Sequence, residues 1–256
     1  MELFDSHLHL DDQAFAADRE QTVARAREAG VVGMVTVGTG LDSCRVAVAL
    51  AEQHRDVFAA IAIHPQDAGG ATDGVMAALR VLAGHPKVVA IGETGLDFVR
   101  ETSPRDAQRR AFRAHLSLAR ACDLPVIIHC REAYPEVLSI LDDERATRVI
   151  MHAFSGSAEM AQQCADRGYG VSLAGPVTYK NARAPREVAR VVPIDQLLLE
   201  TDAPVLTPEP HRGRRNEPAY LTHIAARIAE IRGQPVEEVA AATTANARRI
   251  YGVDDR

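Results

Sequence analysis

The chain has 256 residues, of which 46% are hydrophobic, and its formal net charge is −6. This length is sufficient for one large hydrophobic core, and the acidic balance excludes a protein that coats nucleic acid through a broad basic surface. No apolar run reaches the roughly 18 residues needed to span a membrane, and no signal-peptide pattern opens the chain, so we expect a cytoplasmic protein.

The predicted elements alternate between strands and helices from the first residues onward. An apolar run spans 3–10, and an alanine- and arginine-rich helical stretch spans 18–29 and stops at Gly30. Residues 31–37 form an almost unbroken β-branched run, which is typical of a strand covered on both faces. Further strands are predicted over 57–63, 88–91, 125–128, 148–151, 170–173 and 197–199. Further helices are predicted over 42–53, 72–83, 104–122, 135–141, 158–166, 184–191, 219–231 and 236–251.

This count and order predict the fold class. Eight strands that alternate with helices favour an α/β fold, a (β/α)8 barrel of TIM type, with an open doubly wound sheet as the alternative. No linker, low-complexity segment or charge block divides the chain, so we expect a single domain over residues 1–256.

The cysteines and the arginines indicate which kinds of binding site the chain can form. The four cysteines include no C-x-x-C pair, which fits a reducing compartment and argues against a thiolate zinc site. Arg212, Arg214 and Arg215 form the one dense basic cluster. Such a cluster is by default a solvated loop, but it is also sufficient to hold a few phosphates.

Polar side chains collect at the carboxyl ends of the predicted strands, the edge that carries the active site in such barrels. His7 and His9 end the first strand, where residues two apart point to the same face. Histidines that serve only packing would not be expected to gather at one rim. Five of the ten histidines and three acidic residues follow strand ends: His7, His9, His64, Glu93, His129, His152, Glu200 and Asp202.

Imidazoles and carboxylates are the ligands of zinc, manganese and magnesium-like ions. Four histidines and two carboxylates are too many for one tetrahedral ion and fit two ions that share a bridging carboxylate. Glu93, in the middle of the barrel, is the candidate bridge, and Asp202 is the candidate ligand and proton acceptor. The candidate metal ligands are therefore His7, His9, Glu93, His129, His152 and Asp202.

Several neighbouring residues have two interpretations. His64 precedes a proline and either hydrogen-bonds a loop or faces the substrate. Arg131 is either an outer ion-pair partner or a bidentate ligand for an anionic oxygen, and we favour the second. Asp97 either caps the turn after Gly95 or orients a ligand histidine. The other histidines are expected to be surface or packing residues: His54, His85, His115, His211 and His223.

Seven sequence blocks, in this order, resemble the TatD family of metal-dependent deoxyribonucleases within the amidohydrolase-like superfamily. The blocks are DSHLHLD (5–11), IHP (63–65), GETGLDF (92–98), LPVIIHCR (124–131), HAFSG (152–156), LLETDAP (198–204) and RGRRNEP (212–218). Departures from the family pattern are Gln66 for a second histidine, Thr94 for isoleucine, Phe98 for tyrosine and Ala153 for cysteine. None of these departures removes a ligand.

The resemblance implies a TIM-type barrel with a two-metal site. One ion would be held by His7, His9 and Asp202, the other by His129 and His152, with Glu93 bridging. The implied metals are Mg²⁺, Mn²⁺ or Zn²⁺.

The implied activity is hydrolysis of a phosphodiester at a DNA end by a metal-activated water, with Asp202 taking the proton. His64, Arg131 and the loop at Arg212 would hold phosphate oxygens, contacts that predict weak sequence preference. DNA is then the expected partner, without a membrane or an obligate protein partner. The alternatives are a two-metal amide or ester hydrolase acting on a small molecule or aminoacyl group, and a binding module with a vestigial site.

Overall fold

The computed structural model describes residues 1–253, and its eight strands form one parallel sheet in chain order. After β8, the amide of Asp202 donates to the carbonyl of His7 (2.9 Å) and the amide of His9 donates to the carbonyl of Ala203 (2.8 Å). These bonds join the last strand end to the first, so the predicted (β/α)8 barrel is confirmed. The strands are β1 (Leu3–Leu8), β2 (Val31–Gly38), β3 (Val57–Ile61), β4 (Val88–Asp97), β5 (Val126–Arg131), β6 (Val149–Met151), β7 (Gly170–Leu173) and β8 (Leu197–Leu199).

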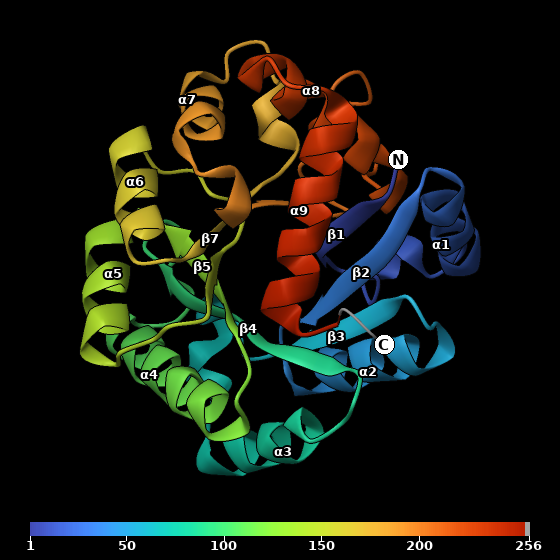
Figure 1. The fold of residues 1–256 in the computed structure, drawn as a ribbon. Helices are drawn as coiled ribbons and strands as arrows, with labels where there is room; N and C mark the ends of the chain where they lie inside the picture. The colour runs from blue at the N-terminus through green and yellow to red at the C-terminus, as the bar shows by residue number, and fades with distance from the viewer. Residues whose placement is uncertain (254–256) are drawn as a thin grey trace.

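Helices surround the ring of strands (Figure 1). The α-helices are α1 (Arg19–Glu28), α2 (Leu41–Gln53), α3 (Asp73–Ala83), α4 (Arg105–Cys122), α5 (Tyr134–Asp143), α6 (Ala158–Asp166), α7 (Arg183–Val191), α8 (Leu221–Arg232) and α9 (Val236–Tyr251). Short 3-10 helices are η1 (Gln13–Phe15), η2 (Pro65–Gly70), η3 (Gly175–Thr178), η4 (Ile194–Gln196) and η5 (Pro218–Tyr220). No helix within residues 1–253 is long and apolar enough to cross a bilayer.

The core has two parts because successive strand residues face opposite sides of the sheet. Val35 and Val37 of β2 belong to a cluster with Phe58, Ile127 and side chains of other strands at the barrel centre. The intervening residue Thr36 is also fully buried. The larger cluster lies between the strands and the helices. Both faces of each strand are therefore covered, which explains the nearly continuous apolar runs in the sequence.

β4 is the main departure from the predicted boundaries. It was expected to end at Ile91 but pairs with β5 as far as Asp97, with a register shift between Ile91 and Thr94. A Cβ on Gly95, whose φ is +140°, would lie 2.1 Å from the carbonyl oxygen of His129. Glycine thus lets the two strands approach closely past the shift. This irregular extension carries Glu93.

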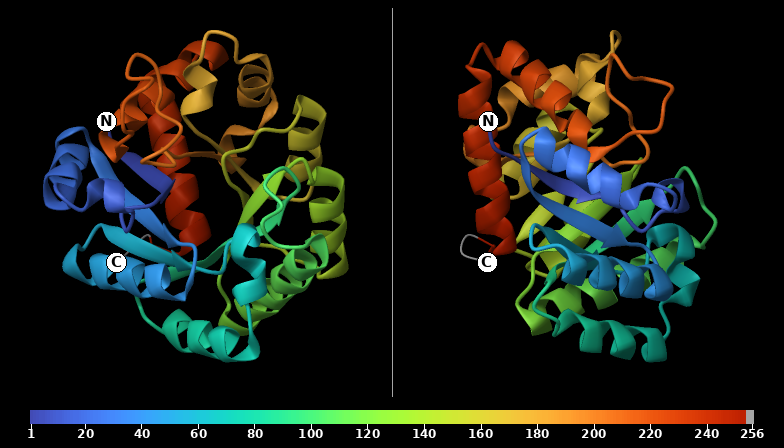
Figure 2. Two further views of the ribbon diagram at one scale, coloured as in Figure 1. Left: turned by 180° about the vertical axis from the view of Figure 1, so that it is seen from behind. Right: turned by 90° about the vertical axis from the view of Figure 1, so that its right-hand side faces the viewer.

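The loops at the carboxyl ends of the strands extend away from the barrel. Figure 2 shows one of them, the orange segment after β8, projecting beyond the strands. A strained backbone begins this loop, since Asp202 and Leu206 have φ values of +53° and +54°. Backbone conformations of this kind are common where a ligand binds.

Candidate metal centre

The structure brings all six predicted ligands together at the carboxyl end of the barrel. His7 is fully buried beneath the others, and His9, Glu93, His129 and Asp202 line a cavity of about 690 Å³. The wall of this cavity also includes His64, Gln66, Asp67, Arg100, Arg131, His152, Val205 and Leu206.

His7, His9 and Asp202, which we call the first ligand group, are spaced as ligands of one ion. The Nε2 atoms of His7 and His9 lie 3.3 Å apart, and the Asp202 Oδ1 atom lies 3.6 Å and 3.4 Å from them, respectively. Four ligands at 2.0–2.1 Å around a tetrahedral ion are separated from one another by about 3.3–3.4 Å. The Nδ1 of His9 donates to the carbonyl of Val37 (2.8 Å), which leaves its Nε2 free to bind an ion.

His129 and His152, the second ligand group, meet the other side of Glu93. The Oε1 atom of Glu93 lies 2.6 Å from His129 Nδ1, 2.8 Å from His152 Nε2 and 3.5 Å from His64 Nε2. Its Oε2 atom lies 3.5 Å from His7 Nε2. The two oxygens of Glu93 thus face the two ligand groups separately.

Buried carboxylates orient the second ligand group from behind. Glu200 Oε1 accepts from His152 Nδ1 (3.1 Å) and from the amide of Ala153 (2.6 Å). Because Glu200 holds the Nδ1 proton of His152, the Nε2 atom of this ring faces the centre as a lone-pair donor. Glu200 is fully buried and was not among the predicted site residues, although it lies two residues before Asp202 in the segment that follows β8.

Asp97 serves both of the roles that its sequence position left open. Its Oδ1 accepts from the amides of Val99 (2.9 Å) and Arg100 (2.8 Å), which caps the turn. Its Oδ2 lies 3.3 Å from His129 Nε2 and accepts from Gln66 Nε2 (2.9 Å). Gln66, which replaces a histidine of the family pattern, therefore contacts the carboxylate behind His129.

The protonation of the centre follows from its buried charges. Burial disfavours the charged form of Glu93, but His152, His64 and His129 hold the pKa of this carboxyl well below its usual range. Burial also lowers the pKa of His152, but Glu93 and Glu200 outweigh it and raise this pKa well above the usual value. The hydrogen bond that the Asp202 carboxylate accepts from His9 likewise overcomes burial and raises the pKa of His9 to about 9.

A divalent cation fits this donor set. Four buried carboxylates surround the histidines, and within residues 1–253 no lysine or arginine forms an ion pair with Glu93, Asp97, Glu200 or Asp202. Protons on imidazoles are therefore the available counter-charge, and a metal ion at the same point would replace them. The ring nitrogens and carboxylate oxygens form three groups of possible ligands, with His64 joining Glu93 and His129 in one of them.

The predicted substrate-binding residues occupy different positions. His64 accepts the amide of Gln66 at Nδ1 (3.2 Å), which is the predicted loop hydrogen bond, and its Nε2 faces Glu93 on the cavity wall, while its contact with substrate stays a prediction. Arg131 is exposed on the cavity wall, and no carboxylate among residues 1–253 pairs with it. Arg212 lies outside the cavity, with its guanidinium 4.2 Å from the Tyr179 ring centre. Arg215 has a structural role, since it binds the Asp18 carboxylate at 2.6 Å and 2.8 Å.

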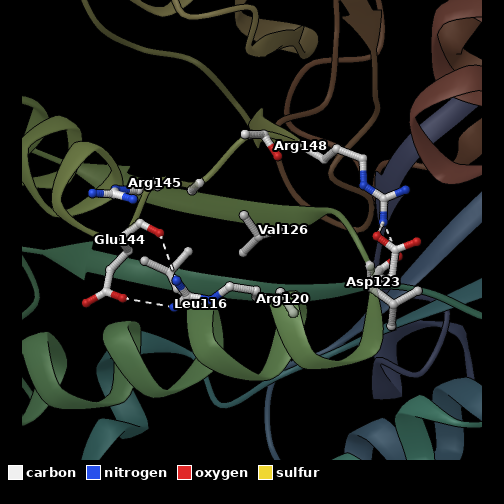
Figure 3. A pocket seen from close by; sticks show the side chains of 11 residues that line it. Leu116, Arg120, Asp123, Val126, Glu144, Arg145 and Arg148 are labelled. Atoms are coloured by element: carbon white, nitrogen blue, oxygen red, sulfur yellow. Dashed lines mark hydrogen bonds and ion pairs between the residues drawn. The ribbon is translucent and has the colours of Figure 1, made fainter.

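A second cavity, of about 140 Å³, lies at the opposite end of the strands, where β5 begins at Val126 (Figure 3). Two of its three arginines are already paired, since Arg120 binds Glu144 and Arg148 binds Asp123. Among the described residues it contains no group of metal ligands. This cavity is therefore not a candidate metal-binding site.

Comparison with known proteins identifies the family. The family model for TatD related DNase matches residues 4–252. The chain belongs to the TatD family. This membership confirms the resemblance inferred from the sequence blocks and the expectation of a metal-dependent hydrolase.

Individual relatives match this chain over almost its full length. A Bacillus subtilis protein named uncharacterized metal-dependent hydrolase YabD is 43% identical over 254 residues, 98% of this chain and 100% of that protein. A Salmonella typhimurium protein named 3′-5′ ssDNA/RNA exonuclease TatD is 40% identical over 259 residues, 98% of this chain and 99% of that protein. The crystal structure of the TatD homologue YJJV from Escherichia coli superposes with a TM-score of 0.93 at 31% identity, covering 98% of each chain.

Proposed function

We propose that the chain is a deoxyribonuclease that hydrolyses phosphodiester bonds at the ends of single-stranded DNA and uses two divalent ions, Mg²⁺, Mn²⁺ or Zn²⁺. The observation that carries the proposal is the position of Glu93, whose Oε2 faces His7 at 3.5 Å and whose Oε1 faces His152 at 2.8 Å. A carboxylate with this placement suits the bridging ligand of a two-ion site. The exonuclease names of TatD relatives support a nucleic-acid substrate attacked from its 3′ end.

The side chains of the cavity have distinct roles in this reaction. When bound, the ions lower the pKa of water and neutralise charge on the phosphate in the transition state. The Asp202 carboxylate accepts the proton of the attacking water; its pKa lies below the usual value because histidine neighbours outweigh the opposing effect of burial. Arg131 holds a phosphate oxygen with its planar guanidinium, and His64 donates to another. Since these contacts reach only the backbone, the enzyme has weak sequence preference.

The proposed enzyme acts in the cytoplasm on DNA and has no obligate protein partner. The four cysteines, Cys44, Cys122, Cys130 and Cys164, are unpaired, which suits a reducing compartment.

The direct test is cleavage of a short 5′-labelled single-stranded oligonucleotide with added Mg²⁺ or Mn²⁺, with and without chelator. Products should shorten from the 3′ end and disappear with chelator. Asp202→Asn should lower kcat by about 10²-fold or more, the size of a lost general base. Asp42→Asn, at an exposed residue of α2, is the matched control and should leave kcat unchanged. Cleavage that survives the chelator would contradict the proposal.

A carbonyl substrate is the competing possibility, because two ions polarise an ester or amide as readily as a phosphoryl group. Arg131→Ala separates the two. If the substrate is a phosphodiester, this variant should raise KM for the oligonucleotide about tenfold and leave any hydrolysis of p-nitrophenyl acetate unchanged. Unchanged turnover of the oligonucleotide would favour the amide or ester hydrolase.

A further inference from the structure

We propose that Tyr179, Arg212 and Arg214 form an outer nucleotide-binding surface, which holds single-stranded DNA beyond the nucleotide at the metal centre. The inference rests on the proposed nuclease function and adds a second contact region to it. The surface lies on the loops after β7 and β8, at the same end of the barrel as the metal centre (Figure 2).

The cationic groups of this surface are free to bind an anion. Arg212 is exposed, and its guanidinium lies over the Tyr179 ring at 4.2 Å from the ring centre. Within residues 1–253 neither Arg212 nor the exposed Arg214 forms an ion pair with a carboxylate. Their neighbour Arg215 shows the contrast, since Asp18 occupies its guanidinium. The charge of the outer surface is therefore not needed to hold the loop.

Contacts between and within the two loops hold the surface in place. The Thr178 hydroxyl accepts from the amide of Glu209 (2.9 Å), and the Thr207 hydroxyl donates to the carbonyl of Arg214 (2.7 Å). A Cβ on Gly175 would lie 1.7 Å from the carbonyl oxygen of Leu206, so the loop backbones are packed directly together. A surface built this way is preorganised, and DNA binding loses little loop entropy.

The outer surface is continuous with the cavity along one loop. Val205 and Leu206, on the cavity wall, begin the loop that carries Arg212 and Arg214. Val205 has 53% of its surface exposed, which is unusual for an apolar residue beside a metal centre and offers a contact for a base. Arg100 and Arg131 also line the cavity, so they reach the phosphate nearest the metal centre. Arg212, outside the cavity, reaches a phosphate or base farther along the strand.

The chemistry of the stacked pair fits a nucleic-acid strand without regard to sequence. A guanidinium that lies over an aromatic ring still has donor groups for a phosphate and a face for a base. Stacking and phosphate contacts of this kind tolerate every base. The outer surface thus predicts that longer oligonucleotides bind better than a dinucleotide.

The test compares steady-state cleavage of dTpdT and of dT8 by the Mn²⁺-loaded enzyme at low salt. Arg212→Ala and Tyr179→Ala should each raise KM for dT8 about 5- to 10-fold and leave kcat and KM for dTpdT within about twofold. Arg212→Lys keeps the charge without the planar stack and should fall between the wild type and Arg212→Ala. Loss of a phosphate contact should also reduce the slope of log affinity against log salt by about 0.7.

Arg80→Ala is the control, because Arg80 is exposed on α3, away from both loops. An unchanged KM for dT8 in Arg212→Ala, or an equal rise for both substrates, would overturn the inference. Failure of the wild type to cleave either substrate would instead contradict the proposed function. In that case the anisotropy of fluorescein-labelled dT8 in EDTA still compares the wild type with Arg212→Ala, and equal affinity would reject the surface.

Discussion

Glu200→Gln tests how a buried carboxylate supports the metal centre. Glu200 Oε1 accepts from His152 Nδ1 (3.1 Å) and from the amide of Ala153 (2.6 Å), while its Oε2 is buried and has no hydrogen-bond partner among the described residues. Glutamine retains a carbonyl oxygen for both donors and removes the negative charge. The substitution therefore changes the basicity of His152 with little change in shape.

The expected loss is in metal affinity. Removing the partner of a metal-binding histidine typically weakens binding 10- to 100-fold, about 1.4–2.7 kcal/mol. The metal-free protein should lose stability as well, because Glu200 helps to raise the pKa of His152 and the substitution removes one partner of this buried, protonated imidazole. Recovery of activity at saturating metal then separates a role in metal binding from general damage to the fold.

Mn²⁺ binding, followed by the EPR signal of the free ion, measures the first effect, and urea unfolding in EDTA measures the second. At saturating Mn²⁺ the variant should recover kcat to within about threefold, because Glu200 orients His152 and does not touch the substrate. Glu187→Gln, at an exposed residue of α7, is the control. Mn²⁺ affinity within twofold of the wild type, or a metal-free variant as stable as the wild type, would refute this reasoning.

Two further predictions concern stability. His115 is buried and neutral, donating from Nδ1 to Ala111 and accepting the amide of Ile63, and burial lowers its pKa from 6.5 to about 4. The unfolded chain therefore binds more protons below about pH 6.5, and this residue should lower stability by about 2.5 kcal/mol at pH 4.5. Urea unfolding at pH 7 and 4.5 should show a smaller loss in His115→Gln than in the wild type, and equal losses would contradict the assignment. Gly175→Ala should lower the free energy of unfolding by about 1–3 kcal/mol, because its Cβ would lie 1.7 Å from the Leu206 carbonyl oxygen; a neutral result would show that the loop moves freely.

The alternation of elements is readable from the sequence because each buried strand is a short apolar run. The predicted strand over 88–91 shows where apolar runs no longer predict a strand's end. The glycines that follow have low strand propensity, so the pattern ends at Ile91, whereas pairing with β5 extends β4 to Asp97. That extension depends on a neighbouring strand, which a single-sequence pattern does not describe.

The same limit applies within the site. Ligand side chains follow strand ends, so the topology alone brings them to one rim. Glu200 has a signal of its own, since it follows the predicted strand over 197–199 directly and lies two residues before Asp202. Its partner His152 is 48 residues away, however, and only the folded barrel pairs the two. The two roles of Asp97 also separate only when its oxygens are seen to face different neighbours.

Anomalous diffraction at the manganese edge, from crystals soaked in Mn²⁺, tests the central claim most directly. We predict two peaks, one beside the first ligand group and one beside the second, with a different oxygen of Glu93 next to each. A single peak, or two peaks of which one has no Glu93 oxygen as a neighbour, would contradict the two-ion account.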